Sequence, residues 1–205
     1  MRFVNPKSKQ ENRMSRHARV LGVGAIVLAL AAAYVTGDLA ADEKSAKEGI
    51  DKLAKSLEKG SPDKAALESM KKEHLDEIMY LFKLRKSGGF GVGANAGAIT
   101  PDGIELKIIS LGKKTLKGDL DKQADAIAEA AYRTAAIADV AIHMCPVKKK
   151  MGDKDPKDWE KWSKGMKDAA MELAKAAKAK DPKKVEAAAK RLNDNCQQCH
   201  GVFRD

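Results

Sequence analysis

Apolar and small residues recur at spacings of three and four along three long stretches in the carboxyl-terminal half of the chain. This spacing places them on one face of a helix, and such faces form the seams between helices of a bundle. The pattern therefore predicts three long amphipathic helices, near residues 120–145, 156–179 and 182–204. The seam positions are Leu120, Ala124, Ile127, Ala131, Thr134, Ala138, Ala141 and Cys145; Trp159, Trp162, Met166, Ala169, Leu173 and Ala176; and Val185, Ala189, Leu192, Cys196, Cys199 and Phe203.

Helix starts are marked by a capping residue that is followed by proline. A side-chain oxygen at the N-cap and a proline at the first helical position are both favoured there. The pairs are Ser61-Pro62, Thr100-Pro101, Asp155-Pro156 and Asp181-Pro182, and Gly118-Asp119 marks one more start. They predict a first long helix over about 62–86 and a short inserted helix over about 101–116. Residues 42–59 form a further amphipathic stretch, and no stretch alternates as a strand would, so the fold is expected to be all-α.

The composition agrees with an all-α fold and argues against a nucleic-acid-binding function. Charged residues make up 33% of the chain and aromatic residues only 4%, which is a helix-forming mixture with a modest, alanine-rich core. The formal charge is +10 for the whole chain and +6 for residues 42–205, where 33 Lys and Arg face 27 Asp and Glu. This mildly basic surface could steer the protein toward acidic redox partners, or it could simply reflect solvated lysine-rich helix faces. No recognition motif or interleaving of aromatic and basic residues is present, so no nucleic-acid partner is expected.

The amino terminus has the layout of an export signal. A basic segment with Arg13, Arg16 and Arg19 precedes a nearly continuous apolar run over residues 20–35, and small residues follow at Ala40 and Ala41. We interpret residues 1–41 as a signal peptide that is cleaved near Ala40 or Ala41. The alternative is an uncleaved membrane anchor, for which the apolar run is near the lower length limit. Both interpretations predict a periplasmic location for the rest of the chain.

The last ten residues contain the motif Cys196-Gln-Gln-Cys199-His200, which is the attachment signature of c-type haem. Two thiols on one helical turn can reach the two vinyl groups of one porphyrin, and the adjacent imidazole can bind the iron. A zinc site would need about four ligands, and no second pair is present. A thioredoxin-like motif would open a helix behind a strand, which is not predicted here. We therefore expect one covalent haem c that faces the bundle interior, because both cysteines lie on the seam.

With the haem motif at the end of the last of four helices, the chain resembles the class II cytochromes c, the cytochrome c′ family. The final helix, with Phe203-Arg204 after the motif, and the tryptophan-containing helix before it carry the resemblance. It implies an antiparallel four-helix bundle over 61–205, His200 as the proximal iron ligand, and members that are often homodimers. The helix over 42–60, the glycine-rich loop over 88–97 and the inserted helix are additions to that pattern.

The resemblance implies two arrangements on the distal side of the haem: an open sixth position, or a methionine from the first helix. The amino-terminal half of the first helix lies beside the end of the last helix in an up-down bundle. Met79 and His74 are therefore both candidates for the sixth iron ligand, and either could instead be an ordinary core residue.

These features predict an electron carrier that is not an enzyme. The iron would cycle between Fe(II) and Fe(III), with the sixth ligand tuning the potential, and no acid–base pair or nucleophile constellation is arranged for catalysis. The alternative is a protein that binds NO or CO at an open distal site. A haem peroxidase would need a distal acid–base group, for which His74 is the candidate, and it is the least favoured class.

Overall fold

The computed structural model describes residues 44–116 and 118–204, and in this part every regular element is helical. This confirms the all-α prediction. The predicted leader or anchor over 1–41 lies outside the described residues, and no helix among those described is long and apolar enough to cross a membrane. The elements are a helix described over 44–58, α2 (Lys64–Met70), α3 (Leu75–Tyr80), the 3-10 helix η1 (Arg85–Ser87), α4 (Ile104–Lys113), α5 (Leu120–Ala141), α6 (Pro156–Lys178) and α7 (Pro182–Phe203).

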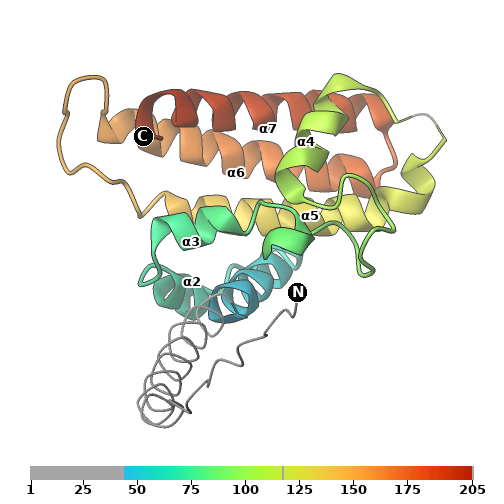
Figure 1. Cartoon of the computed structure of the whole chain (residues 1–205), viewed down its shortest axis with the longest axis horizontal. Helices are drawn as coiled ribbons and strands as arrows, with labels where there is room; N and C mark the ends of the chain where they lie inside the picture. The colour runs from blue at the N-terminus through green and yellow to red at the C-terminus, as the bar shows by residue number, and fades with distance from the viewer. Residues whose placement is uncertain (1–43, 117, 205) are drawn as a thin grey trace, which may run out of the picture. The chain divides into compact units, whose positions relative to one another are not determined.

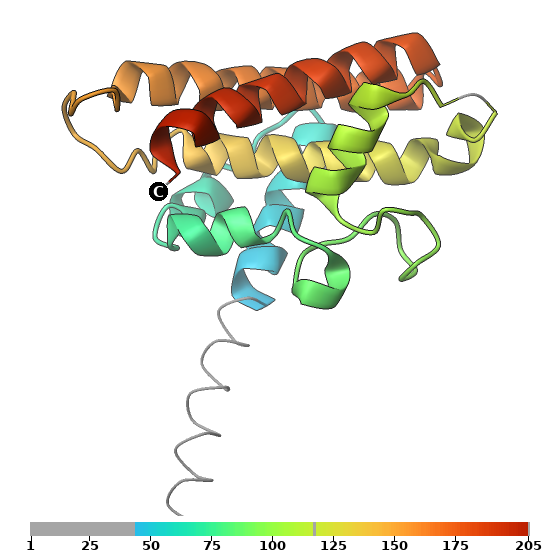
Figure 2. The same ribbon diagram turned by 45° about the horizontal axis from the view of Figure 1, so that its top comes forward.

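The three long helices α5, α6 and α7 run side by side, each antiparallel to the next, and α4 packs across α7 (Figure 1, Figure 2). Their predicted seams form the core. Every predicted seam residue within α5 is buried, but the helix ends at Ala141, so the last predicted position, Cys145, lies beyond it and is half-buried. In α6 and α7 only Trp162 and the two cysteines remain half-buried. Alanine dominates these faces, so the helices can approach closely. At Gly112 an added Cβ would lie 3.1 Å from the backbone of Lys190, so α4 lies almost directly on α7.

The predicted first long helix over 62–86 is wrong as a single element. The chain forms α2 and α3 instead, separated by a turn in which His74 has extended backbone angles as the N-cap of α3. The break lets both short helices bury apolar residues. Met70 packs so tightly against the helix 44–58 that a Cβ at Gly49 would lie 1.8 Å from its sulfur, while Ile78 and Leu81 enter the core. Tertiary packing therefore overrides the continuous helical pattern.

The predicted N-terminal caps of the last two helices, α6 and α7, are confirmed. The Asp155 carboxylate accepts a hydrogen bond from Lys157 N at 2.9 Å, and the Asp181 carboxylate accepts two at the start of α7. Two predicted starts are wrong by a few residues. Asp63 rather than Ser61 caps α2, and α4 begins at Ile104 rather than directly after Pro101. The side chain of Asp102 binds the preceding loop, so the chain turns before α4 can begin.

The additional amino-terminal helix is present and packs on the bundle. Its predicted apolar face, with Ala46, Ile50, Leu53 and Leu57, is buried. Arg133 of α5 binds it through an ion pair with Asp51, with 2.7 Å between Nε and Oδ1. This helix therefore belongs to the same folded body as the long helices.

Candidate haem site

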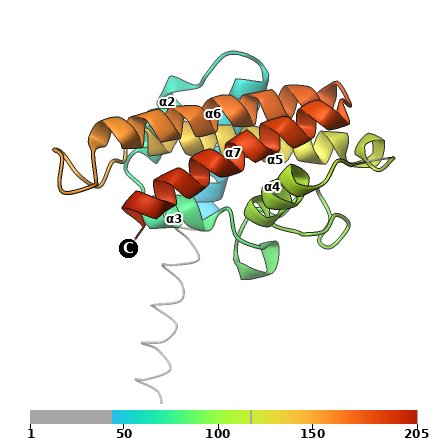
Figure 3. The same ribbon diagram turned by 90° about the horizontal axis from the view of Figure 1, so that it is seen from above.

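A cavity of about 400 Å³ lies against the carboxyl-terminal half of α7. Figure 3 shows that this part of α7 passes over α3, with α6 on one side and α4 further along the helix. Four helices contribute to the wall, which is mostly apolar and has polar groups at its edge. The lining residues are Leu75, Asp76, Met79, Tyr80, Phe82 and Lys83; Glu105 and Ile108; Trp159, Trp162, Ser163 and Met166; and Asn193, Asn195, Cys196, Gln197, Cys199, His200, Phe203 and Arg204.

The three motif residues predicted to hold a haem all line this cavity. Cys196, Cys199 and His200 are half-buried and project from one side of α7. Both cysteines are free thiols. The helical spacing of the motif therefore directs both thiols and the imidazole into the same cavity.

The protonation of these thiols distinguishes the site from a redox dithiol. Burial raises the pKa of Cys196 to about 12, and burial together with the neighbouring Cys145 raises the pKa of Cys199 to about 11. A thiol–disulfide oxidoreductase needs a lowered pKa to form its thiolate nucleophile. Both thiols are instead protonated near neutral pH, which argues against the thioredoxin-like interpretation.

His200 is suited to bind a metal centre within the cavity. Burial, with a smaller contribution from the Arg204 charge, lowers the pKa of its imidazole. The neutral imidazole is the form that coordinates iron or other metals. In residues 44–116 and 118–204 no group of three or more Cys, His, Asp or Glu side chains could hold a metal ion directly, so a zinc site finds no ligand set there.

Three aromatic rings close the end of the cavity next to His200. Phe203 packs edge-on against Trp159 and Trp162, with ring centroids 5.0 and 6.1 Å away. The indole of Trp159 donates a 2.7 Å hydrogen bond to the carbonyl oxygen of Ala141 at the end of α5. These contacts join the ends of α5, α6 and α7 at the haem motif. The sequence placed both tryptophans on the seam but gave no sign of this hydrogen bond.

Close contact between α6 and α7 forms the wall beside Cys196. The sulfur of Met166 lies 3.6 Å from the Cys196 sulfur. One residue earlier on each helix, Gly165 lets Asn195 approach so closely that a Cβ added at Gly165 would lie 2.3 Å from the Asn195 amide oxygen. The first cysteine is therefore held against α6.

The two candidates for the sixth ligand occupy different environments. Met79 is half-buried and lines the cavity, whereas His74 is exposed at the start of α3 and does not line it. In a single helix over 62–86, His74 would lie on the same apolar face as Ile78 and Leu81. Because the helix breaks at residues 71–74, the phase changes and Met79 faces the motif side.

The structure also reveals site residues that the sequence did not indicate. Phe82 and Lys83 follow α3, and Glu105 and Ile108 come from α4. No sequence pattern showed that α4 would pack on α7 and reach the cavity. Cys145 packs with Cys199 in the apolar cluster around Trp159, and its thiol donates to the carbonyl oxygen of Val147 at 3.1 Å.

A helical bundle whose last helix directs Cys-x-x-Cys-His into an apolar cavity defines a class of haem proteins, the c-type cytochromes. Comparison with protein families agrees: residues 107–204, from within α4 to the end of α7, match the family model for cytochrome c′. These residues, which include the Cys-x-x-Cys-His motif, are therefore similar to the cytochrome c′ family, a family of haem-binding c-type cytochromes. Searches of curated proteins and of solved structures gave no significant match.

The residues around the cavity fit the haem that the family implies. The wall is mostly apolar, as the faces of a porphyrin require, and His200 offers a neutral ring nitrogen that could bind the iron. The exposed cations Lys83 and Arg204 at the edge suit the two propionate groups. The family match begins after α3, so Met79 lies outside it.

Proposed function

We propose that this chain is an exported c-type cytochrome that carries single electrons and is not an enzyme. Its haem would be attached through thioethers to Cys196 and Cys199, and the His200 imidazole and the Met79 thioether would bind the iron. When bound, the haem supplies one-electron exchange between Fe(II) and Fe(III). The observation that carries the proposal is the cavity itself, because the two thiols, His200 and Met79 line it together.

The surrounding residues have roles that follow from their positions. The cluster of Trp159, Trp162 and Phe203 excludes water from the proximal end and fixes the end of α7. Burial of His200 keeps its imidazole neutral and available to the iron. A methionine ligand favours the reduced iron and so raises the reduction potential, whereas a second histidine would lower it.

The proposal includes export of the chain and docking of an acidic redox partner. The basic and apolar character of residues 1–41 supports export to the periplasm, with or without retention as an anchor. The exposed run Lys148-Lys149-Lys150 lies in the loop between α5 and α6, which the figures place at the same end of the bundle as the carboxyl end of α7 (Figure 1, Figure 3). Its charge supports docking of an acidic redox partner near the haem.

The sixth ligand is tested by absorption spectra of the ferric and ferrous holoprotein with and without CO. We expect a low-spin spectrum and no rapid CO binding in the wild type. Met79→Leu should give a high-spin spectrum that responds at once to CO, because leucine cannot bind iron. His74→Ala and Met166→Leu are matched controls, because His74 lies outside the cavity and Met166 is a second methionine that lines it. Both variants should have the spectrum and the CO response of the wild type. A wild-type protein that binds CO immediately would refute the proposal and favour the gas-binding alternative.

Covalent attachment is tested separately. Replacing both Cys196 and Cys199 by Ala should let acid–acetone extract the haem, while Cys145→Ala should leave it bound to the chain. Colour that stays with the double variant would place the attachment elsewhere.

A further inference from the structure

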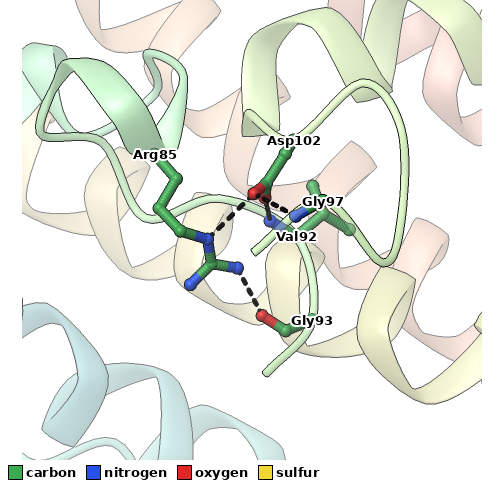
Figure 4. Close-up of polar contacts among 5 residues, drawn as sticks. All are labelled: Arg85, Val92, Gly93, Gly97 and Asp102. Atoms are coloured by element: carbon green, nitrogen blue, oxygen red, sulfur yellow. Dashed lines mark hydrogen bonds and ion pairs between the residues drawn. The ribbon is translucent and has the colours of Figure 1, made fainter. Parts of the chain in front are cut away.

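The glycine-rich loop between η1 and α4 is organised by one ion pair (Figure 4). The Arg85 side chain donates from Nε to Asp102 Oδ2 at 3.0 Å and from Nη2 to the carbonyl oxygen of Gly93 at 2.5 Å. The Asp102 carboxylate also accepts hydrogen bonds from the backbone N–H groups of Val92, at 2.8 Å, and Gly97, at 3.1 Å. We call Arg85 and Asp102 the loop clamp.

The loop clamp is partly shielded from water and closely fitted. The side chains of Arg85 and Asp102 are 29% and 16% exposed. Burial alone would raise the pKa of Asp102, but the hydrogen bonds from Arg85, Val92 and Gly97 outweigh it and lower the pKa. Asp102 is therefore ionised at neutral pH. A Cβ at Gly91 would lie 2.5 Å from both clamp side chains, so the backbone wraps directly around the pair.

The loop clamp also closes a short antiparallel contact between the segment after α3 and the start of α4. Arg85 N donates to Asp102 O at 2.9 Å, and Glu105 N donates to Phe82 O at 3.1 Å. Leu84 and Gly103 form an isolated β-bridge between these two bonds. The ion pair thus lies at one end of a ladder whose other end reaches Phe82 and Glu105, two residues of the cavity wall.

The position of α3 depends on such anchors. It spans only Leu75–Tyr80, well below the length of about 12–15 residues at which an isolated helix becomes even marginally stable. Its buried anchor is Ile78, and Leu81 follows directly. Met79, between them, faces the cavity, so a shift of the ladder would shift the thioether relative to His200. Neither clamp residue lines the cavity, so any effect on the haem must act through this backbone.

We propose that the loop clamp of Arg85 and Asp102 is a positioning device that holds Met79 in reach of the haem iron. This proposal rests on the proposed function, in which Met79 is the sixth ligand. The clamp residues do not touch the iron or the haem. Their role is to lock α3 to α4 so that the methionine remains bound when the iron changes its oxidation state.

The test measures the rate of CO binding to the ferrous holoprotein, the ferric spin state and the reduction potential in clamp variants. Asp102→Asn and Arg85→Gln should raise the CO binding rate at least tenfold and lower the potential, because Met79 dissociates more often. Arg85→Lys retains the positive charge beside Asp102 but loses the hydrogen bond to the Gly93 carbonyl oxygen. Its CO binding rate and potential should therefore lie between those of the wild type and of Arg85→Gln. Its milder change also provides the test if the other variants do not fold.

Two comparisons separate positioning from a general loss of stability. Asp51→Asn weakens the ion pair between Asp51 and Arg133, which resembles the loop clamp in geometry but joins the amino-terminal helix to α5. This substitution should leave CO binding unchanged. In a Met79→Leu background the clamp substitutions should change the CO rate less than twofold. If the clamp variants fold and keep the wild-type CO binding rate and potential, while Met79→Leu has an altered spectrum, the positioning role is overturned and the ligand assignment of Met79 stands. An unaltered Met79→Leu spectrum instead overturns the ligand assignment and this inference with it.

Discussion

Replacing Trp159 by phenylalanine should destabilise the protein through a single buried hydrogen bond and a small packing defect. Trp159 is 4% exposed, and its indole nitrogen donates to Ala141 O at 2.7 Å. That carbonyl oxygen also accepts from Met144 N at 3.0 Å, so it keeps one partner in the variant. The lost hydrogen bond should therefore cost about 1 kcal/mol, the lower end of the range for a disrupted buried pair.

The smaller ring adds a second cost. Phenylalanine preserves an edge contact with Phe203 but leaves part of the indole volume unfilled. Buried carbon atoms contribute about 0.8 kcal/mol per methylene equivalent, so the missing part of the ring should cost about 1–2 kcal/mol. The expected loss in the free energy of unfolding is about 2–3 kcal/mol. For a chain of this size that corresponds to a Tm lowered by roughly 5–10 °C.

Trp162→Phe is the matched control, and the assay is urea unfolding of the holoprotein followed by far-UV circular dichroism. Trp162 also packs edge-on against Phe203, but it is half-buried, and within the described part of the chain its indole makes no side-chain hydrogen bond. Its substitution should cost less than about 1 kcal/mol. Equal losses in the two variants, or a larger loss for Trp162→Phe, would refute the role assigned to the Ala141 hydrogen bond.

Three further predictions concern the loop and the buried charges. Gly91 and Gly97 both have positive φ angles, of 72° and 74°, but only a Cβ at Gly91 would meet the loop clamp. Gly97→Ala should therefore lower the free energy of unfolding by about 1 kcal/mol, and Gly91→Ala should lower it clearly more. Thermal denaturation measures both losses. Burial lowers the pKa of Lys107, so the unfolded chain binds more protons between that pKa and about 10.4, and stability rises with pH across this window. Lys107→Met should abolish the rise in urea unfolding series. Arg133→Ala removes a partly buried ion pair, in which the arginine side chain is 13% and the Asp51 side chain 35% exposed, and it should cost about 2 kcal/mol. Arg191→Ala, at an exposed pair, should cost at most about 0.5 kcal/mol in the same assay.

Local sequence determined those features that depend on residues close together in the chain. The spacing of apolar residues gave α5, α6 and α7 and their buried faces, because a single helix places such residues on one side. The caps Asp155 and Asp181 lie within one turn of the groups they bind. The Cys196, Cys199 and His200 motif predicted the candidate haem site for the same reason, since all three lie on one turn of one helix.

Only the tertiary structure decided what surrounds that motif. The break before α3 could not be read from residues 62–86, because the helical pattern continues through it and the gain comes from Met70 and Ile78 packing against separate elements. That break removed His74 from the cavity and left Met79 in it. Asp102 likewise falls in the first turn of the predicted inserted helix, yet it precedes α4 and binds Arg85 across the whole glycine-rich loop. Contacts between distant segments depend on how helices pack in three dimensions, and that information is not contained in the periodicity of any one of them.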